Sequence, residues 1–185
     1  DLRVAFHWYD PDVPLTFDRD VDASVWLIAP DVGGDRDADI VSDWLSEPER
    51  ARRARIQHPR AMAEFLAGRR LIRDILGQVL GVAPAAVNLV ENRYGALSLD
   101  PSYASPWQFN LSHTDGLLAL ALSRQRIGVD VEWISRPGRT VELADRYFAK
   151  TEVAALRALS EAAQRDRFFA LWTLKEAYIK ARGMG

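Results

Sequence analysis

FFALWTLKEAYIKAR, residues 168–182, is the stretch around which the rest of the chain is organised. We expect a helix here, because no Gly or Pro interrupts the stretch and its apolar residues recur with helical spacing. Lys175 falls inside the apolar arc at about 100° per residue. A cation in that position indicates that the helix borders a polar site as well as a core. The apolar stripe consists of Leu171, Leu174, Tyr178 and Ala181.

The composition predicts a globular protein without cysteine chemistry. Of the 185 residues 48% are apolar, and the net charge of −2 argues against a general nucleic-acid binder. The sequence contains no cysteine, which excludes a disulfide scaffold, a thiol nucleophile and a Cys metal site. It has neither a long apolar run nor a signal-peptide layout, so we expect a cytoplasmic protein with no membrane partner.

The sequence before residue 107 predicts a strand, two helices and a hairpin. The elements expected are a buried strand at 24–29, a loop at 32–39, a helix that begins at Ser46 with a capping box to Glu49, a second helix at about 61–80, and strands at 87–90 and 96–99 around a turn at 92–95.

The sequence after residue 107 begins with strand-like runs and ends with helical patterns. Residues 109–114 lead into an apolar run at 117–123, which we expect to form a hairpin with residues 127–133. A linker is expected at 135–138, and a helical region from about Thr140.

The chain contains an internal repeat at an offset of 103 residues, which matches Glu49 with Glu152 and Phe65 with Phe168. The repeat also lays the strand at 25–29 on residues 128–132. We therefore expect an α+β fold of two similar α/β halves related by a pseudo-two-fold duplication. Each half would be a small, mostly antiparallel sheet packed with a long helix, with boundaries at 1–107 and 108–185. Counterparts of the strands at 87–99 would begin near residue 190, so the second half is expected to lack its C-terminal strands in this sequence.

Three carboxylates suggest a divalent-metal site. In a strand, Asp130 and Glu132 point to the same face, and their counterparts in the repeat are apolar. Together with Glu176 on the neighbouring helix, they provide hard oxygen ligands of the kind that suit Mg²⁺. The alternative is that the first two acids lie at the surface and Glu176 pairs with Lys180 at i+4. The spacing alone favours neither interpretation.

Several cationic or polar side chains are candidates for binding phosphate groups. Lys175 and Lys180 would match the charge of a diphosphate beside a metal ion, although Lys175 is equally suited to lie along an apolar surface through its aliphatic stem. His113 follows Ser112 at the join of the two halves. The sequence favours neither a structural role nor a ligand role for His113. The arginines of the first half are expected mainly on solvated helix faces.

Three segments together resemble the signature blocks of the 4'-phosphopantetheinyl transferases. They are FNLSHT at 109–114, IGVDVE at 127–132 and WTLKEAYIK at 172–180. The length and the repeat resemble the larger type, named for activation of surfactin synthetase, which is a pseudodimeric monomer. The resemblance extends from about Glu47 to Gly185. It implies a monomeric Mg²⁺-dependent enzyme, with Mn²⁺ as an alternative ion. Such an enzyme transfers the phosphopantetheine arm of coenzyme A to a serine of an apo acyl or peptidyl carrier protein and releases adenosine 3',5'-bisphosphate.

The resemblance also implies roles for single residues. The metal ligands would be Asp130, Glu132 and Glu176. Glu176, directly or through a metal-held water, would be the base for the carrier serine, and Lys180 would stabilise or protonate the leaving phosphate. The residues implied to contact coenzyme A are Arg52, Arg53, Gly95, Ala96, Ser112, His113, Lys175 and Lys180.

Two departures from the family pattern concern the nucleotide end of the site. Ala96-Leu97 stands where the family often has Lys-Pro, and Glu64 occupies a position where many relatives carry a basic residue. Arg52, Arg53 or Arg69 would compensate. Two other classes of function stay open: a non-catalytic protein of the same fold that binds coenzyme A or a carrier, and a metal-dependent phosphohydrolase. The intact Lys-Glu and Asp-Val-Glu motifs favour the transferase, but the sequence does not select the carrier.

Overall fold

The computed structural model describes residues 2–18, 20–31, 38–135 and 140–184. Its centre is a four-stranded mixed sheet in the order β1-β2-β6-β5. β1 pairs parallel with β2, while β2 with β6 and β6 with β5 are antiparallel. The fold is α+β, as predicted. The strands are β1 (Val4–Trp8), β2 (Ala23–Ile28), β5 (Gln108–Thr114) and β6 (Leu117–Ser123).

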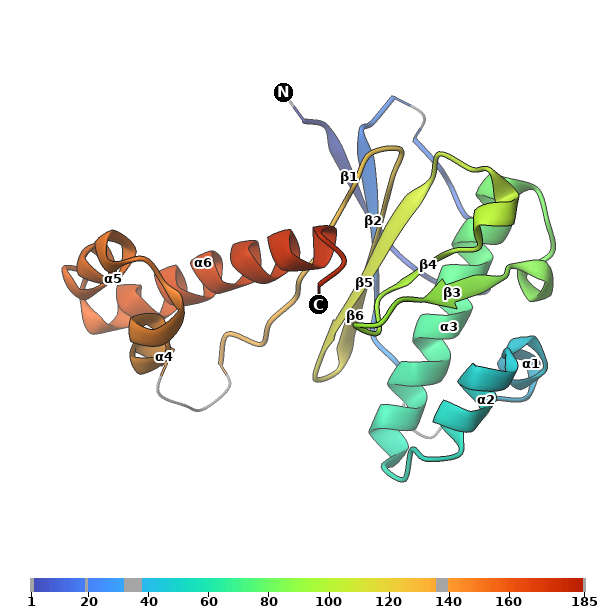
Figure 1. Ribbon diagram of the computed structural model, residues 1–185, viewed down its shortest axis with the longest axis horizontal. Helices are drawn as coiled ribbons and strands as arrows, with labels where there is room; N and C mark the ends of the chain where they lie inside the picture. Colours follow the sequence, from blue (N-terminus) through green and yellow to red (C-terminus); the bar gives the residue numbers. More distant parts are fainter. Residues whose placement is uncertain (1, 19, 32–37, 136–139, 185) are drawn as a thin grey trace.

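The central strand β6 is apolar on both faces. Leu118, Leu120 and Leu122 belong to the main core with Leu71 and Ile75 of α3 (Pro59–Leu80), which covers one face of the sheet (Figure 1). On the other face, the alanines of β6 contact residues of the segment 127–131. This alternation follows the two-residue period of a strand. The apolar run at 117–123 is therefore explained by burial on both sides.

The predicted helix start at Ser46 is confirmed. α1 (Ala38–Trp44) is followed by α2 (Glu47–Arg53), and the Ser46 backbone N–H donates to Glu49 Oε2 at 2.9 Å. Glu49 is buried and binds two arginines of α3: its Oε1 lies 2.6 Å from Arg69 Nε, and its Oε2 lies 2.6 Å from Arg73 Nη2. The expectation of solvated arginines is wrong for these two, because a buried carboxylate draws them into the protein.

The hairpin predicted in the first half is confirmed. β3 (Leu89–Glu91) pairs antiparallel with β4 (Leu97–Leu99), and this pair lies between the short helices η1 (Pro84–Ala86) and η2 (Pro101–Tyr103). In the turn, Asn92 Oδ1 accepts hydrogen bonds from the Tyr94 and Ala96 N–H groups. Gly95 has φ 87°, a left-handed conformation that glycine adopts without strain.

The hairpin predicted between residues 117–123 and 127–133 is wrong. β6 is paired on both edges, by β2 and β5, so it has no free edge for another strand. Residues 127–133 form no strand. They lie beside β5 and are held by its side chains, because the Val129 N–H donates to Asn110 Oδ1 at 2.9 Å and the Val131 N–H donates to Ser112 Oγ at 3.3 Å.

The last three helices form a second cluster that lies away from the sheet (Figure 1). They are α4 (Thr140–Tyr147), α5 (Lys150–Arg157) and α6 (Glu161–Ala181). Phe168 and Phe169 of α6 pack with Phe148 and Leu156 in a core of their own. α6 begins before the predicted stretch and runs from this cluster toward the sheet. No helix in the described ranges is long and apolar enough to cross a membrane.

The predicted packing stripe of α6 is wrong in its middle. Leu174 and Tyr178 are 67% and 62% exposed. The N-terminal half of the helix packs into the helical cluster through Phe168 and Phe169, and its C-terminal half contacts the segment at 128–132 from Trp172 to Ala181. The exposed Leu174 and Tyr178 therefore interrupt the predicted stripe.

The helix starts that the structure describes allow a comparison with the predicted repeat. α2 and α3 begin at Glu47 and Pro59, and α5 and α6 begin 103 and 102 residues later, at Lys150 and Glu161. The repeat aligns the strand at 25–29 with residues 128–132. Residues 128–132, however, form no strand in the structure. The pseudo-two-fold relation and the boundary between 107 and 108 stay predictions. Most of the loop predicted at 32–39 and of the linker at 135–138 lies outside the described residues.

Candidate functional site

Three separate parts of the chain meet at Ser112 of β5. The Ser112 hydroxyl donates to Asp130 Oδ1 at 3.0 Å, and it accepts a hydrogen bond from Lys180 Nζ at 2.7 Å. Lys180 Nζ also lies 2.5 Å from Asp130 Oδ1. Each of the three segments predicted to carry chemistry therefore contributes one side chain to this cluster.

Gly128 allows α6 to come this close. A Cβ atom at residue 128 would lie 2.0 Å from the Ala177 carbonyl oxygen and 2.6 Å from the Ala181 backbone nitrogen. Only glycine fits against the helix backbone at such a distance. Two features of the sequence indicate this contact: the lone glycine before Asp130, and the two alanines one turn apart on α6. The contact was not predicted from them.

Asp130 has the properties of a cation ligand. Its side chain is 6% exposed, and its Oδ2 atom has no hydrogen-bond partner among the residues that the structure describes. A buried, unpaired carboxylate oxygen is costly unless a cation or a donor supplies the missing interaction. The donor chemistry of Asp130 therefore fits a hard divalent ion.

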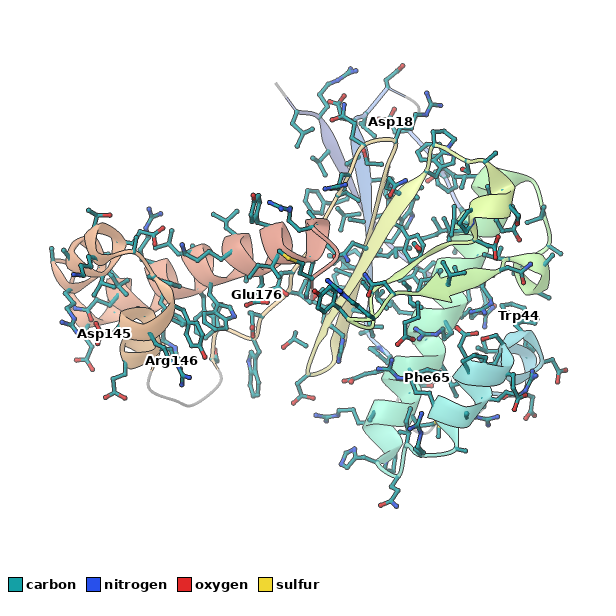
Figure 2. The ribbon with its side chains drawn as sticks, in the orientation of Figure 1. Asp18, Trp44, Phe65, Asp145, Arg146 and Glu176 are labelled. Atoms are coloured by element: carbon teal, nitrogen blue, oxygen red, sulfur yellow. The ribbon has the colours of Figure 1, made fainter. Side chains whose placement is uncertain are left out.

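The other two predicted metal ligands lie on the segment 127–133 and on α6. Glu132 Oε1 accepts a hydrogen bond from Trp172 Nε1 at 3.1 Å. Glu176 lies on the part of α6 nearer the sheet (Figure 2). Within the described residues, no group of three or more His, Cys, Asp or Glu side chains is close enough to hold a metal ion. The structure thus joins Asp130 to Ser112 and Lys180, and it does not assemble the predicted triad.

A pocket of about 450 Å³ opens beside the Ser112 cluster, between α2, α3, the β3–β4 hairpin and β5. Its lining includes the buried Arg69, which Glu49 holds in place, and Glu64. A shallow hollow of about 430 Å³ shares His113 with this pocket and contains Glu132. The pocket lining brings together six of the eight residues predicted to contact coenzyme A: Arg52, Gly95, Ala96, Ser112, His113 and Lys180.

The structure does not bring the other two predicted contacts, Arg53 and Lys175, to this pocket. Lys175 Nζ instead lies 2.9 Å from Glu152 Oε2 and 5.2 Å from the centre of the Phe148 ring, within the helical cluster. The hydrogen bond from Lys175, with another from the Ala149 N–H, holds the pKa of Glu152 below its ordinary value. Lys175 therefore connects α6 to α5 in this structure.

The charges of the site suit an anionic ligand that arrives with a cation. Arg52, Arg69 and Lys180 line the 450 Å³ pocket beside the Ser112 cluster, whereas Glu64 is the acid among its lining residues. Lys180, which lines this pocket, forms an ion pair with the buried Asp130 carboxylate. Phosphate groups would meet the basic side chains there, and a divalent ion would meet the Asp130 carboxylate.

Comparisons with known proteins agree on one family. The pattern that describes the 4'-phosphopantetheinyl transferase superfamily matches residues 126–185. The chain is 36% identical over 177 residues to the 4'-phosphopantetheinyl transferase HetI of Nostoc sp., covering 95% of this chain and 73% of that protein. It is 30% identical to a 4'-phosphopantetheinyl transferase of Bacillus subtilis, and the matched region covers 87% of this chain and 69% of that protein. It is 36% identical to the 4'-phosphopantetheinyl transferase gsp of Aneurinibacillus migulanus, and the matched region covers 65% of this chain and 48% of that protein. The chain thus spans from about half to three quarters of the length of these relatives.

Proposed function

Because the chain belongs to the 4'-phosphopantetheinyl transferase superfamily, we propose that it transfers the 4'-phosphopantetheine group of coenzyme A to a serine of an apo carrier protein. The observation that carries this proposal is the pocket at the Ser112 cluster. Three segments far apart in the sequence meet there, and six predicted coenzyme A contacts line one cavity. The carrier would be an acyl or peptidyl carrier of fatty acid, polyketide or nonribosomal peptide synthesis.

The reaction requires one bond to form and one to break. The carrier serine oxygen bonds to the phosphorus that bears pantetheine, and the bond from that phosphorus to the bridging oxygen of the diphosphate breaks. The serine proton passes to a base, for which we propose Glu176, and the released product is adenosine 3',5'-bisphosphate. Lys180 would stabilise the charge that develops on the leaving phosphate, since its ammonium already lies at the pocket wall.

We also propose that Asp130, Glu132 and Glu176 hold Mg²⁺ or Mn²⁺. The buried Asp130 Oδ2 supports this assignment, because a cation would supply its missing partner. A bound divalent ion would neutralise charge on the diphosphate. The metal dependence, the cytoplasmic location, the monomeric state and the two-half architecture remain proposals from the sequence and the family.

Replacement of Asp130 tests the proposed site. We expect Asp130→Ala to abolish transfer of label from coenzyme A to an apo carrier in the presence of Mg²⁺, because the variant loses the buried ligand and the partner of Lys180. The matched control is Asp145→Ala, which removes an exposed partner of Arg157 in the helical cluster (Figure 2). Circular dichroism checks that both variants are folded. Undiminished transfer by folded Asp130→Ala would contradict the proposed site.

A further inference from the structure

We propose that Trp172 is a positioning residue whose indole N–H orients the Glu132 carboxylate for cation binding. The inference rests on the proposed function and adds a residue that does not itself contact the metal or the substrate. Trp172 Nε1 donates to Glu132 Oε1 at 3.1 Å, across 40 residues of sequence. This hydrogen bond connects the helical cluster to the segment that carries both acids of the Asp-Val-Glu motif.

The indole ring is fixed from two sides. It stacks on Phe168, with ring centroids 5.6 Å apart and an interplanar angle of 25°. It meets Tyr147 of α4 edge to face, at 5.7 Å and 87°. Phe168 is fully buried and itself stacks on Phe148. Because these contacts hold the ring in one orientation, the carboxylate must adjust to the indole N–H.

The backbone of Glu132 lies outside the sheet. Side chains of β5 form hydrogen bonds with this segment at Val129, Asp130 and Val131, which precede Glu132 in the chain. A glutamate has several rotatable bonds, and ordering it on binding a cation costs conformational entropy. A hydrogen bond from a fixed donor places the carboxylate before the ion binds. Outer partners of this kind typically change metal affinity by about 10–100-fold.

Trp172→Phe separates the hydrogen bond from the packing. Phenylalanine keeps an aromatic ring against Phe168 and Tyr147 but removes the N–H group. We expect Mn²⁺ alone, followed by electron paramagnetic resonance, to bind about tenfold more weakly to the variant than to the wild type. The thermal midpoint should change little.

The matched control is Trp133→Phe, which makes the same chemical change next to Glu132. Trp133 is 48% exposed, and its indole N–H has no hydrogen-bond partner in the described part of the chain. We expect this control to bind Mn²⁺ like the wild type. An equal loss of affinity in both variants would overturn the inference, because the effect would then not require the hydrogen bond to Glu132.

Two outcomes separate this inference from the proposed function. If the wild type labels a carrier and binds Mn²⁺, and folded Trp172→Phe binds Mn²⁺ equally well, then the role of Trp172 is wrong and the transferase proposal stands. If the wild type labels no carrier and binds no Mn²⁺, with or without coenzyme A, both fail.

A measurement on the wild type covers the case in which Trp172→Phe does not fold. The protein has six tryptophans, and nuclear magnetic resonance gives each indole N–H its own signal. We expect the Trp172 signal, assigned through its own side-chain correlations, to shift during a Mg²⁺ titration while the Trp133 signal shifts less. An unchanged Trp172 signal at saturating Mg²⁺ would overturn the inference.

Discussion

At the scale of single residues, Glu49 is the buried charge on which the wall of the pocket depends. Burial alone would raise the pKa of its carboxyl, but the hydrogen bonds from Arg73 and the Ser46 N–H, with the nearby charge of Arg69, lower the pKa below its ordinary value. Glu49 is therefore ionised at neutral pH and holds Arg69 at the pocket. The same ion pairs connect α2 to α3.

We expect Glu49→Gln to lower the free energy of unfolding by about 3–5 kcal/mol, because it leaves two buried arginines without their counter-ion. Urea denaturation at pH 7 measures the change. The control is Glu47→Gln, whose side chain is 83% exposed and pairs with Arg50 at 3.0 Å. Its effect should stay within about 0.5 kcal/mol. Equal effects of the two substitutions would contradict the account.

The contribution of Glu49 should also depend on pH. Its folded-state pKa is lowered, so the unfolded chain takes up the proton first as the pH falls. The stabilisation is complete at neutral pH, starts to fall near the ordinary glutamate pKa of about 4.3, and is lost below the folded-state pKa. The difference between wild type and Glu49→Gln should therefore shrink as urea denaturation is repeated at decreasing pH below about 5. A constant difference would contradict this assignment.

At the scale of elements, the contact between α6 and the segment 127–133 decides the geometry of the site. We expect Gly128→Ala to push the helix away, because its Cβ would lie 2.0 Å from a backbone oxygen. The free energy of unfolding should fall by about 1–3 kcal/mol, and the transfer rate by about 100-fold if Lys180 moves by about 1 Å. Denaturation and carrier labelling measure the two effects.

Gly116→Ala is the matched comparison for Gly128→Ala. Gly116 has φ 79°, and an added Cβ would meet nothing within 4 Å, so alanine there brings only backbone strain of about 1–2 kcal/mol. This variant should lose stability and keep its transfer rate per folded molecule. If both variants kept the wild-type rate, the α6 contact would not position the site.

The strand predicted at 127–133 and the single apolar stripe predicted on α6 are wrong for physical reasons. Alternation over residues 127–133 predicted a strand, but pairing is non-local, and both edges of β6 are taken by β2 and β5. For α6, one apolar stripe assumes one continuous core. The first half of the helix packs into the helical cluster and its second half contacts the segment 127–133, while Leu174 and Tyr178 remain exposed. Local signals performed better: the capping box at Ser46 and the turn at Gly95 were both confirmed.

At the scale of the molecule, α6 extends from the helical core to the segment 127–133 beside the sheet, and the site lies where this helix reaches that segment (Figure 1). Ser112, Asp130 and Lys180, which the motifs assign to one site, lie within hydrogen-bonding distance of one another. The pairing of Arg69 with Glu49 could not be predicted, because the two residues lie on different helices and no local pattern encodes their contact. The role of Trp172 depends on a contact across 40 residues, which no local pattern encodes.

The most direct test of the central claim is the mass of an apo carrier protein after incubation with this protein, coenzyme A and Mg²⁺. A carrier whose acceptor serine is replaced by alanine serves as the control. The account predicts that the carrier gains the mass of one phosphopantetheine group at that serine, with equimolar release of adenosine 3',5'-bisphosphate, and that the control gains nothing. An unmodified mass for every acyl and peptidyl carrier tested, with this protein folded, would contradict it.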